Sequence, residues 1–392
     1  MDELRMVKEA YGEPEPPTLR EMTEARARMF EESPPRRARR GWRLKAGFGL
    51  VAAGAAAAVA IAATGSGTPA SPSAPADLGK RAVLAAAERA EAQPTGDFWF
   101  YHGTSGRSLI VRSETGDYAI VAAPEEGFMW IGAEPDAGPG TYNRNLPSRP
   151  LTAQDEALWK KAGSPSEFKV WDGERLFTYD QGVTRWRSWD PSRRGDGAWI
   201  GGRTFEEAER LPTDAGELAD LLASGNLYFH LLSPEEKERF KKEHGIPERR
   251  SMTPLDKLTV VAALLQTKPM PPAFRAGLMR ALAAQPWVKA IDGVTDSLGR
   301  EGVALAVGLK TTHVTAAQGA PAEERGDYDS RKEIVFDERT GEMLAVQTVL
   351  TRPGGPYRDR DPGFVLRFSL ILDSGWTDTK PKPPEELPFR SR

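Results

Sequence analysis

Three short motifs contain the residue types of a serine acyl-transfer site. Ser166 and Lys169 have the Ser-x-x-Lys spacing, residues 224–226 read Ser-Gly-Asn, and residues 339–341 read Arg-Thr-Gly. In an acyl-enzyme mechanism the lysine lies one helical turn after the serine, so that its amine reaches and activates the hydroxyl. The motifs predict, as one alternative, an envelope serine hydrolase or transpeptidase that uses Ser166 and Lys169.

The local sequence around Ser166 favours a strand instead of a helix. Pro165 precedes the serine, and the residues after Glu167 read Phe-Lys-Val-Trp, which is typical of a β-strand. Residues three apart in a strand point to opposite faces, which would separate Lys169 from Ser166. We therefore expect no enzymatic activity and assign no catalytic residue.

The composition argues against metal, cofactor and nucleic-acid binding. The chain contains no cysteine, which excludes disulfides, thiolate nucleophiles and cysteine-based zinc sites. Its four histidines are far apart in the sequence and lack the spacing of a helical metal-binding pair. The formal net charge is −3 over 392 residues, so no overall basic field favours nucleic acid.

Aromatic residues supply the candidate ligand-binding surface. Seven of the ten tryptophans fall between residues 99 and 199, where strand patterns dominate. Aromatic side chains on a sheet can fill a core, or they can line a concave face that holds an apolar, sugar or peptide ligand. On the second interpretation the ligand-binding residues are Trp99, Tyr101, Trp130, Trp171, Trp186 and Trp189.

Strand patterns come in two blocks, one before and one after a helical middle. A polar loop is expected at 101–108, between two of the strands, and the final strand is apolar on both faces, which predicts a central position in its sheet. Asp172-Gly173 is expected to form a two-residue hairpin turn. The expected strands and hairpins cover residues 97–103, 108–113, 117–122, 168–180, 303–309, 333–350 and 364–372.

Helical patterns occur before, within and between these blocks. An alanine-rich helix is expected at 80–92 and another helix at 153–162. Apolar residues recur with the 3.6-residue period over 218–222, 255–265 and 274–282, and Asp214 and Ser233 have the character of helix starts. Strands followed by helices and again by strands predict an α+β fold. We expect a mainly antiparallel, curved sheet packed with helices.

An uncharged segment, residues 46–64, predicts one transmembrane helix. As a helix it would be about 28 Å long, close to the roughly 30 Å hydrocarbon core of a bilayer. Arginines and a lysine precede it, and no basic residue follows until Lys80, so the N-terminus is expected in the cytoplasm. A cleaved export signal and a buried soluble helix are the alternatives, but about 45 residues precede the apolar run, far more than a signal peptide carries.

The chain therefore divides into five expected segments, and the folded mass lies outside the cell membrane. The linker is rich in proline and serine, a composition that cannot build a core. The segments are a cytoplasmic tail at 1–40, a transmembrane helix with a basic flank at 41–65, the linker at 66–77, an extracytoplasmic α+β domain at 78–376 and a flexible tail at 377–392.

This layout resembles an uncharacterised actinobacterial family of single-pass membrane proteins. The phrases that carry the resemblance are "MDELRMVKEAYGEPEPPTLREMTEARARMF" in the tail and, in the outer domain, "LPTDAGELADLL", "PAFRAGLMRALAAQPWVKAIDGVTDSLGREGVALAV" and "EIVFDERTGEMLAVQTVL". Such proteins accompany extracytoplasmic-function sigma factors, which implies a role in envelope signalling and a cytoplasmic regulatory partner. The family brings no catalytic residues. The tail lacks the His/Cys cluster of zinc-binding anti-sigma factors.

The outer domain also has a more distant resemblance to lipoprotein-carrier-like domains. The "DERTGEML" hairpin and the aromatic strands are similar to those of such domains, which fold a curved antiparallel sheet around helices and bind acyl chains or peptides. We therefore expect a non-enzymatic membrane protein that binds or senses an apolar or peptide ligand outside the cell, with the bilayer as its other partner. A passive lipid or lipoprotein carrier or scaffold is a third alternative.

Overall fold

A computed structural model describes residues 78–384, except 135–136, 190–199 and 245–251. The cytoplasmic tail, the transmembrane segment and the linker expected before residue 78 lie outside the described residues. Among the helices of the described part, none combines the length and the apolarity needed to cross a bilayer. The described residues fold as α+β, with eight α-helices and one large sheet whose pairings are all antiparallel.

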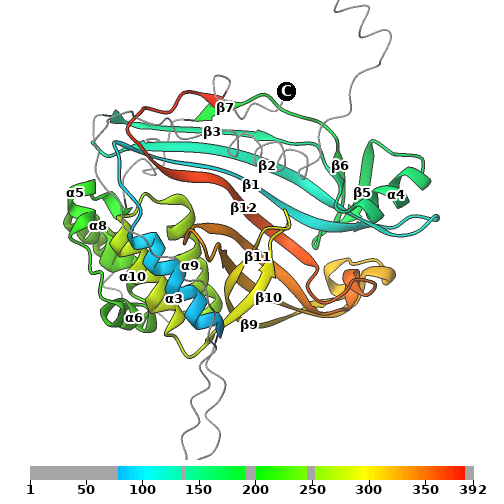
Figure 1. Ribbon diagram of the computed structural model, residues 1–392. Helices are drawn as coiled ribbons and strands as arrows, with labels where there is room; N and C mark the ends of the chain where they lie inside the picture. The colour runs from blue at the N-terminus through cyan, green and yellow to red at the C-terminus, as the bar shows by residue number, and fades with distance from the viewer. Residues whose placement is uncertain (1–77, 135–136, 190–199, 245–251, 385–392) are drawn as a thin grey trace, which may run out of the picture. The chain divides into compact units, whose positions relative to one another are not determined.

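The large sheet has ten strands and curves across the molecule in Figure 1. Its order is β7-β3-β2-β1-β12-β11-β10-β9-β8, and β4 pairs with β2 outside this path. Two further strands, β5 (Glu167–Trp171) and β6 (Leu176–Asp180), form a separate hairpin. The strands of the large sheet are β1 (Phe98–Val111), β2 (Tyr118–Gly132), β3 (Pro139–Asn145), β4 (Arg149–Pro150), β7 (Arg187–Trp189), β8 (Val288–Thr295), β9 (Glu301–Val314), β10 (Gly326–Phe336), β11 (Met343–Arg352) and β12 (Val365–Thr377).

The polar loop expected at 101–108 is wrong, because these residues lie inside the unbroken strand β1. Both neighbours, β2 and β12, pair with this segment, so its backbone groups are satisfied by the sheet in spite of its polar side chains. Gly106 is required there, since an added Cβ would come within 2.7 Å of Val121 and 2.8 Å of Phe368. Glycine therefore occurs at this position because neighbouring side chains pack closely against the strand, and not because the chain turns.

Two other expectations about strands are confirmed. The apolar final strand, β12, lies in the middle of the sheet between β1 and β11. The segment 333–350 forms the β10–β11 hairpin, with Gly341 at a φ of 74° in its turn. The hairpin at 168–180 also forms, but four residues connect its strands instead of two, and the Asp172 carboxylate accepts the backbone amides of Glu174 and Arg175.

Helices pack against one end of one sheet face, which we call the inner face. Trp99, Leu305, Ile334 and Ile371 from this face join the helices in the largest hydrophobic cluster. In Figure 1 the helices gather below this end of the sheet. They are α3 (Leu78–Glu91), α5 (Phe205–Glu209), α6 (Ala215–Ser224), α7 (Leu227–Leu231), α8 (Pro234–His244), α9 (Pro254–Thr267) and α10 (Pro272–Ala283).

The β5–β6 hairpin and α4 (Ala153–Lys161) cover the other end of the inner face. Leu109 and Val111 lie on the same side of β1 as Trp99, because side chains alternate along a strand. They pack with Phe168 and Val170 of the hairpin in a second hydrophobic cluster. The inner face is thus covered at both ends by different elements.

Candidate functional site

A groove of about 400 Å³ opens on the inner face between the two coverings. One wall is α9, and the floor consists of segments of β1, β2, β10, β11 and β12. This volume falls within the range of about 300 to 1,000 Å³ that is typical of small-ligand sites. The groove is therefore the candidate functional site of the described residues.

The wall of the groove is one face of α9. Thr259, Ala262, Ala263 and Gln266 line it, and their spacing of three and four residues places them on the same side of a helix. The helix begins with a capping box between Thr253 and the third helical residue, and proline occupies its first turn. Because two of the four wall residues are alanines, the wall leaves space next to the sheet.

Three cations lie in one row across the floor of the groove. Arg107 on β1 is directly opposite Arg367 on β12, Arg367 is opposite Thr348 on β11, and Thr348 is opposite Lys332 on β10. Residues that oppose each other in neighbouring strands present their side chains on the same face. Lys332 confirms which face this is, since its ammonium donates to the Thr259 hydroxyl on α9 at 3.0 Å.

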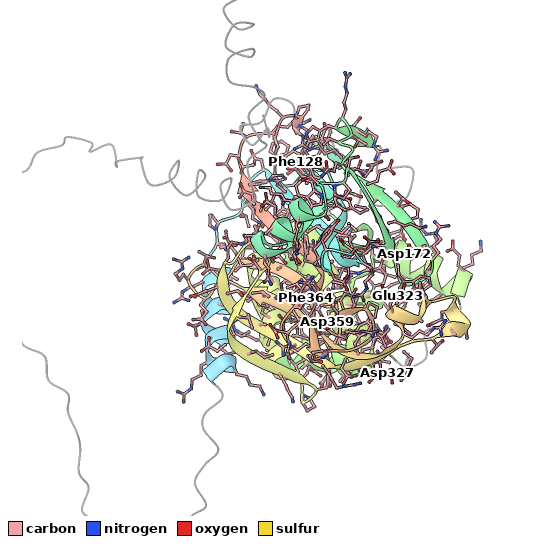
Figure 2. All side chains as sticks on the ribbon, turned by 90° about the vertical axis from the view of Figure 1, so that its right-hand side faces the viewer. Phe128, Asp172, Glu323, Asp327, Asp359 and Phe364 are labelled. Carbon is pink, nitrogen blue, oxygen red and sulfur yellow. The ribbon has the colours of Figure 1, made fainter. Side chains whose placement is uncertain are left out.

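Arg107 is already held by the β5–β6 hairpin. Its guanidinium donates to the Asp172 carbonyl at 3.2 Å, lies 3.6 Å from the Asp172 carboxylate and donates to the Tyr179 hydroxyl. Burial alone would raise the pKa of the Asp172 carboxyl, but the backbone amides of Arg175 and Glu174 and the charge of Arg107 lower it. Asp172 is labelled on the side of the molecule that faces the viewer in Figure 2.

Lys332 and Arg367 form the uncompensated part of the row. Among the described residues, no carboxylate lies within ion-pair distance of either side chain. Burial, and next the charge of Arg367, lower the pKa of the Lys332 ammonium. The floor therefore carries positive charge on the half-buried Lys332 and on the solvent-exposed Arg367.

A polar network lies at the helical end of the groove. Gln266 donates to the Tyr101 hydroxyl at 2.8 Å and also to the Ser369 hydroxyl. Burial raises the pKa of Tyr101, so its hydroxyl stays neutral and remains a hydrogen-bonding group at physiological pH. Gln266 is thus fixed between the helix and two strands of the floor.

The structure brings only two of the expected aromatic ligand residues together. Trp99 and Tyr101 are buried against the helices, with ring centroids 6.5 Å apart, and Tyr101 reaches the groove through Gln266. Trp130 is directly opposite Phe100 in the sheet. Side chains alternate along β1, so Phe100 and Trp130 lie on the face opposite to that of Trp99 and Tyr101. There it contacts the ring of Phe98 at 5.9 Å.

The other three expected tryptophans lie in separate places. Trp171 is buried with Val314 and Ala320 in a small cluster, and the half-buried Trp186 has the Arg144 guanidinium 4.7 Å above its ring. Trp189 is the last residue of β7, and its side chain lies outside the described residues. The six residues as a ligand surface stay a prediction of the sequence.

The serine motif occupies strand and loop positions. Ser166 immediately precedes β5, and Lys169 is an exposed residue in the middle of that strand. Residues 224–226 lie at the end of α6 and the start of α7, and residues 339–341 lie in the β10–β11 turn. No helix begins at Ser166, so the helical geometry that would bring Lys169 to the serine is not formed.

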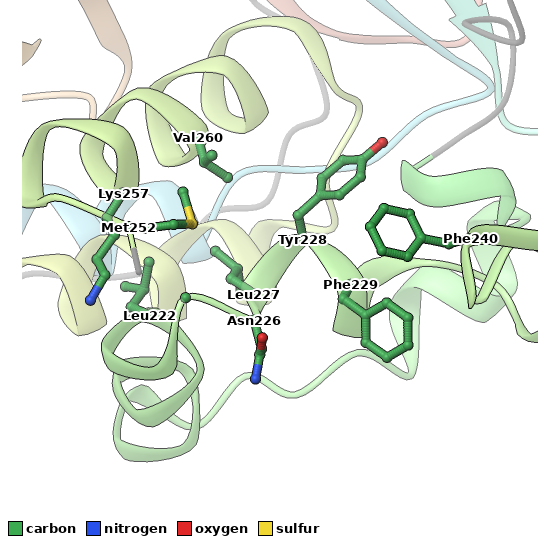
Figure 3. A pocket seen from close by; sticks show the side chains of 10 residues that line it. Leu222, Asn226, Leu227, Tyr228, Phe229, Phe240, Met252, Lys257 and Val260 are labelled. Carbon is green, nitrogen blue, oxygen red and sulfur yellow. The ribbon is translucent and has the colours of Figure 1, made fainter. Parts of the chain in front are cut away.

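A second, smaller pocket lies between α6, α7, α8 and α9 (Figure 3). Its volume is about 170 Å³, and its lining includes Leu222, Tyr228, Phe229 and Phe240. The rings of Phe229 and Phe240 lie 5.7 Å apart on one side of it. The pocket is smaller than a typical ligand site, so we assign no function to it.

Sequence reasoning missed the cations of the groove. Arg107, Lys332 and Arg367 are up to 260 residues apart (367 − 107), and each looks like an ordinary surface residue in its own segment. One signal was present, because Arg367 and Ser369 interrupt the otherwise apolar central strand at alternating positions. Polar residues on one face of a central strand indicate that this face is not fully covered.

The described residues show no other centre that would define a chemistry. No group of three or more His, Asp or Glu side chains within residues 78–384, gaps excepted, is placed to hold a metal ion. The groove presents hydrogen-bond donors and cationic side chains. No protein-family model, curated protein or solved structure matches the chain.

Proposed function

We propose that the protein is a membrane-anchored, extracytoplasmic ligand-binding or sensing protein, and that its ligand occupies the groove beside α9. The observation that supports this best is the groove itself, an open space of about 400 Å³ on the inner face of the sheet. Donor groups from α9, β10, β11 and β12 converge on it. Convergent polar groups in a concave site are typical of ligand recognition.

The membrane anchor is supported by the sequence. The uncharged residues 46–64 and the basic flank before them favour a topology with the described domain outside the cell and residues 1–40 inside it. The bilayer is then one partner, and the tail is available to a cytoplasmic regulatory partner. This arrangement suits a link to envelope signalling.

The groove has a mechanical connection to the helix that follows the linker. Strands β10 and β11 carry Lys332 and Thr348, and their turn packs on α3, where an added Cβ on Gly341 would come within 2.7 Å of the Ala90 amide nitrogen. The Gln93 side chain, just after α3, donates to the Thr340 carbonyl at 3.3 Å. If the β10–β11 hairpin has two arrangements and a ligand binds one of them more tightly, the ligand shifts the population toward that arrangement. The contact with the hairpin turn would then move α3, which follows the linker in the sequence.

A variant that fills the groove tests the proposal. Ala263→Trp places a large side chain on the exposed groove wall, and Ala157→Trp makes the same change on an exposed position of α4. The full-length protein is purified from its native membranes in a mild detergent, and its bound small molecules are extracted and identified by mass spectrometry. We expect one compound to accompany the wild type and Ala157→Trp and to be absent from Ala263→Trp.

Equal amounts of compound in all three proteins, or none in any, would contradict the proposed binding site. The topology is tested separately by adding protease to intact cells. We expect the domain to be digested while the tail stays protected, because the basic flank remains on the cytoplasmic side. Protection of the domain until lysis would contradict the extracytoplasmic placement.

A further inference from the structure

We infer that the groove selects ligands that carry an anionic oxygen group, a carboxylate or a phosphate, held by Arg367, Thr348 and Lys332. The inference rests on the proposed function, since it names the chemistry of the ligand in the same groove. It differs from the sequence-based expectation of a purely apolar or peptide ligand on an aromatic face.

The charges of the floor support an anion first. Arg107, Arg367 and Lys332 present three like charges in one cross-strand row, an arrangement that destabilises a sheet when it is not compensated. Asp172 and Tyr179 compensate Arg107, whereas no carboxylate of the described residues pairs with Arg367 or Lys332. An anion bound at this point supplies the missing compensation.

The spacing of the row fits one oxyanion. Neighbouring strands are about 4.8 Å apart, so Arg367 and Lys332 begin roughly 10 Å apart with Thr348 between them. Both cationic side chains are long enough to converge above the threonine. Lys332 uses one ammonium proton on Thr259 and keeps two, while a guanidinium provides a fork that matches carboxylate and phosphate oxygens.

The remaining lining indicates a small acid with a short apolar part. Ala262 and Ala263 on the wall and Val346 on the floor offer apolar contacts next to the cations. Gln266 adds a polar group at the end of the groove, where it is held by Tyr101. A neutral analogue of the same shape would leave the two cations uncompensated and is expected to bind much more weakly.

The test uses three small probes with one aromatic ring each. Phenyl phosphate and phenylacetate represent the two sources of an oxyanion, and benzyl alcohol is the neutral probe. Affinities for the full-length protein in a non-ionic detergent are measured by isothermal titration calorimetry at 50 and 500 mM NaCl. We expect one or both anions to bind the wild type, benzyl alcohol to bind at least tenfold more weakly, and the higher salt to weaken anion binding.

Single substitutions assign the binding to the row. We expect Arg367→Gln and Lys332→Gln each to weaken anion binding at least tenfold, and Arg367→Lys to recover part of the loss. Arg339→Gln is the matched control, because that arginine is 89% exposed in the β10–β11 turn and outside the groove. Lys332→Gln should melt no lower than the wild type, since it removes a charge that the fold partly buries.

Two results would overturn the inference, and a separate measurement on Ala263→Trp then decides whether the proposed function holds. Equal anion binding by the wild type, Arg367→Gln and Lys332→Gln would overturn it, as would a preference for benzyl alcohol. If Ala263→Trp still abolishes binding of the preferred probe in these cases, the groove remains the ligand site with another chemistry. Anion binding that survives Ala263→Trp would contradict both statements.

Discussion

At the scale of single residues, a buried ionic network lies on the sheet face opposite the groove. The His102 Nε2 atom on β1 lies 2.7 Å from Glu126 Oε1 on β2. The other carboxylate oxygen, Oε2, accepts a hydrogen bond from the Arg144 guanidinium of β3, also at 2.7 Å. Burial alone would raise the pKa of Glu126, but His102 and Arg144 outweigh it and lower the pKa. The network joins three strands at the end of the sheet remote from β8.

This network predicts a specific pH dependence of stability. A carboxylate with a lowered folded pKa stabilises the fold at pH values above its unfolded pKa of about 4.5, and the contribution disappears as the pH falls through the lowered value. We expect Glu126→Gln to lower the free energy of unfolding by about 3 kcal/mol at pH 7, because it leaves buried partners without their charge. The deficit should shrink below about pH 4, measured by urea denaturation across the pH range.

Glu125→Gln is the matched control for this experiment. Glu125 is the preceding residue on β2, is exposed and accepts only a long 3.4 Å hydrogen bond from Asn143. We expect it to change stability by less than about 0.5 kcal/mol at every pH. A constant difference between Glu126→Gln and the wild type from pH 7 to pH 3 would show that the network does not act through its charge.

At the scale of elements, β1 carries the arrangement that makes the groove. It is continuous for 14 residues, so it connects the helical core around Trp99 with the hairpin that holds Arg107. Its glycines replace side chains where neighbours from other strands need the space. Gly103 lies beneath the Tyr101 ring, and Gly106 lies between Val121 and Phe368.

Two glycine-to-alanine substitutions test this interpretation of β1. Gly106→Ala forces a methyl group within 2.7 Å of Val121 and 2.8 Å of Phe368, so we expect it to destabilise the fold by about 1 to 3 kcal/mol. Gly127→Ala on β2 is the control, because its nearest neighbour, the Tyr142 carbonyl, is 4.0 Å away. Both are measured by chemical denaturation, and equal effects would contradict the packing argument.

At the scale of the whole molecule, the sheet is closed by residues from the two ends of the described chain. β12, the last strand, pairs with β1, the first, from Phe98 opposite Thr377 to Arg107 opposite Arg367. It also pairs with β11, so it is the only described connection between the two halves of the large sheet. Folding of the domain therefore depends on contacts between residues 260 or more positions apart in the chain, as for Arg107 and Arg367 in the groove row.

Two truncated fragments test whether folding depends on the pairing of β12 with β1 and β11. A fragment of residues 78–384 is expected to unfold in one cooperative thermal transition followed by circular dichroism. A fragment of residues 78–362 lacks β12, so β1 and β11 each lose one of their two neighbouring strands, and we expect no cooperative transition. A cooperative transition in the shorter fragment would show that the halves fold independently.

The amino-acid sequence by itself determined the elements whose patterns are local. The helical periods of 255–265 and 274–282 and the hairpins at 168–180 and 333–350 follow from neighbours a few residues apart, and the apolar faces of 364–372 predicted a central strand. Only the tertiary structure decided that 101–108 is a strand, because pairing on both sides outweighs its polar and glycine-rich composition. It also decided the groove. Strand register, which depends on the packing of the whole sheet, places Arg107, Arg367 and Lys332 in one row, and no local pattern encodes that register.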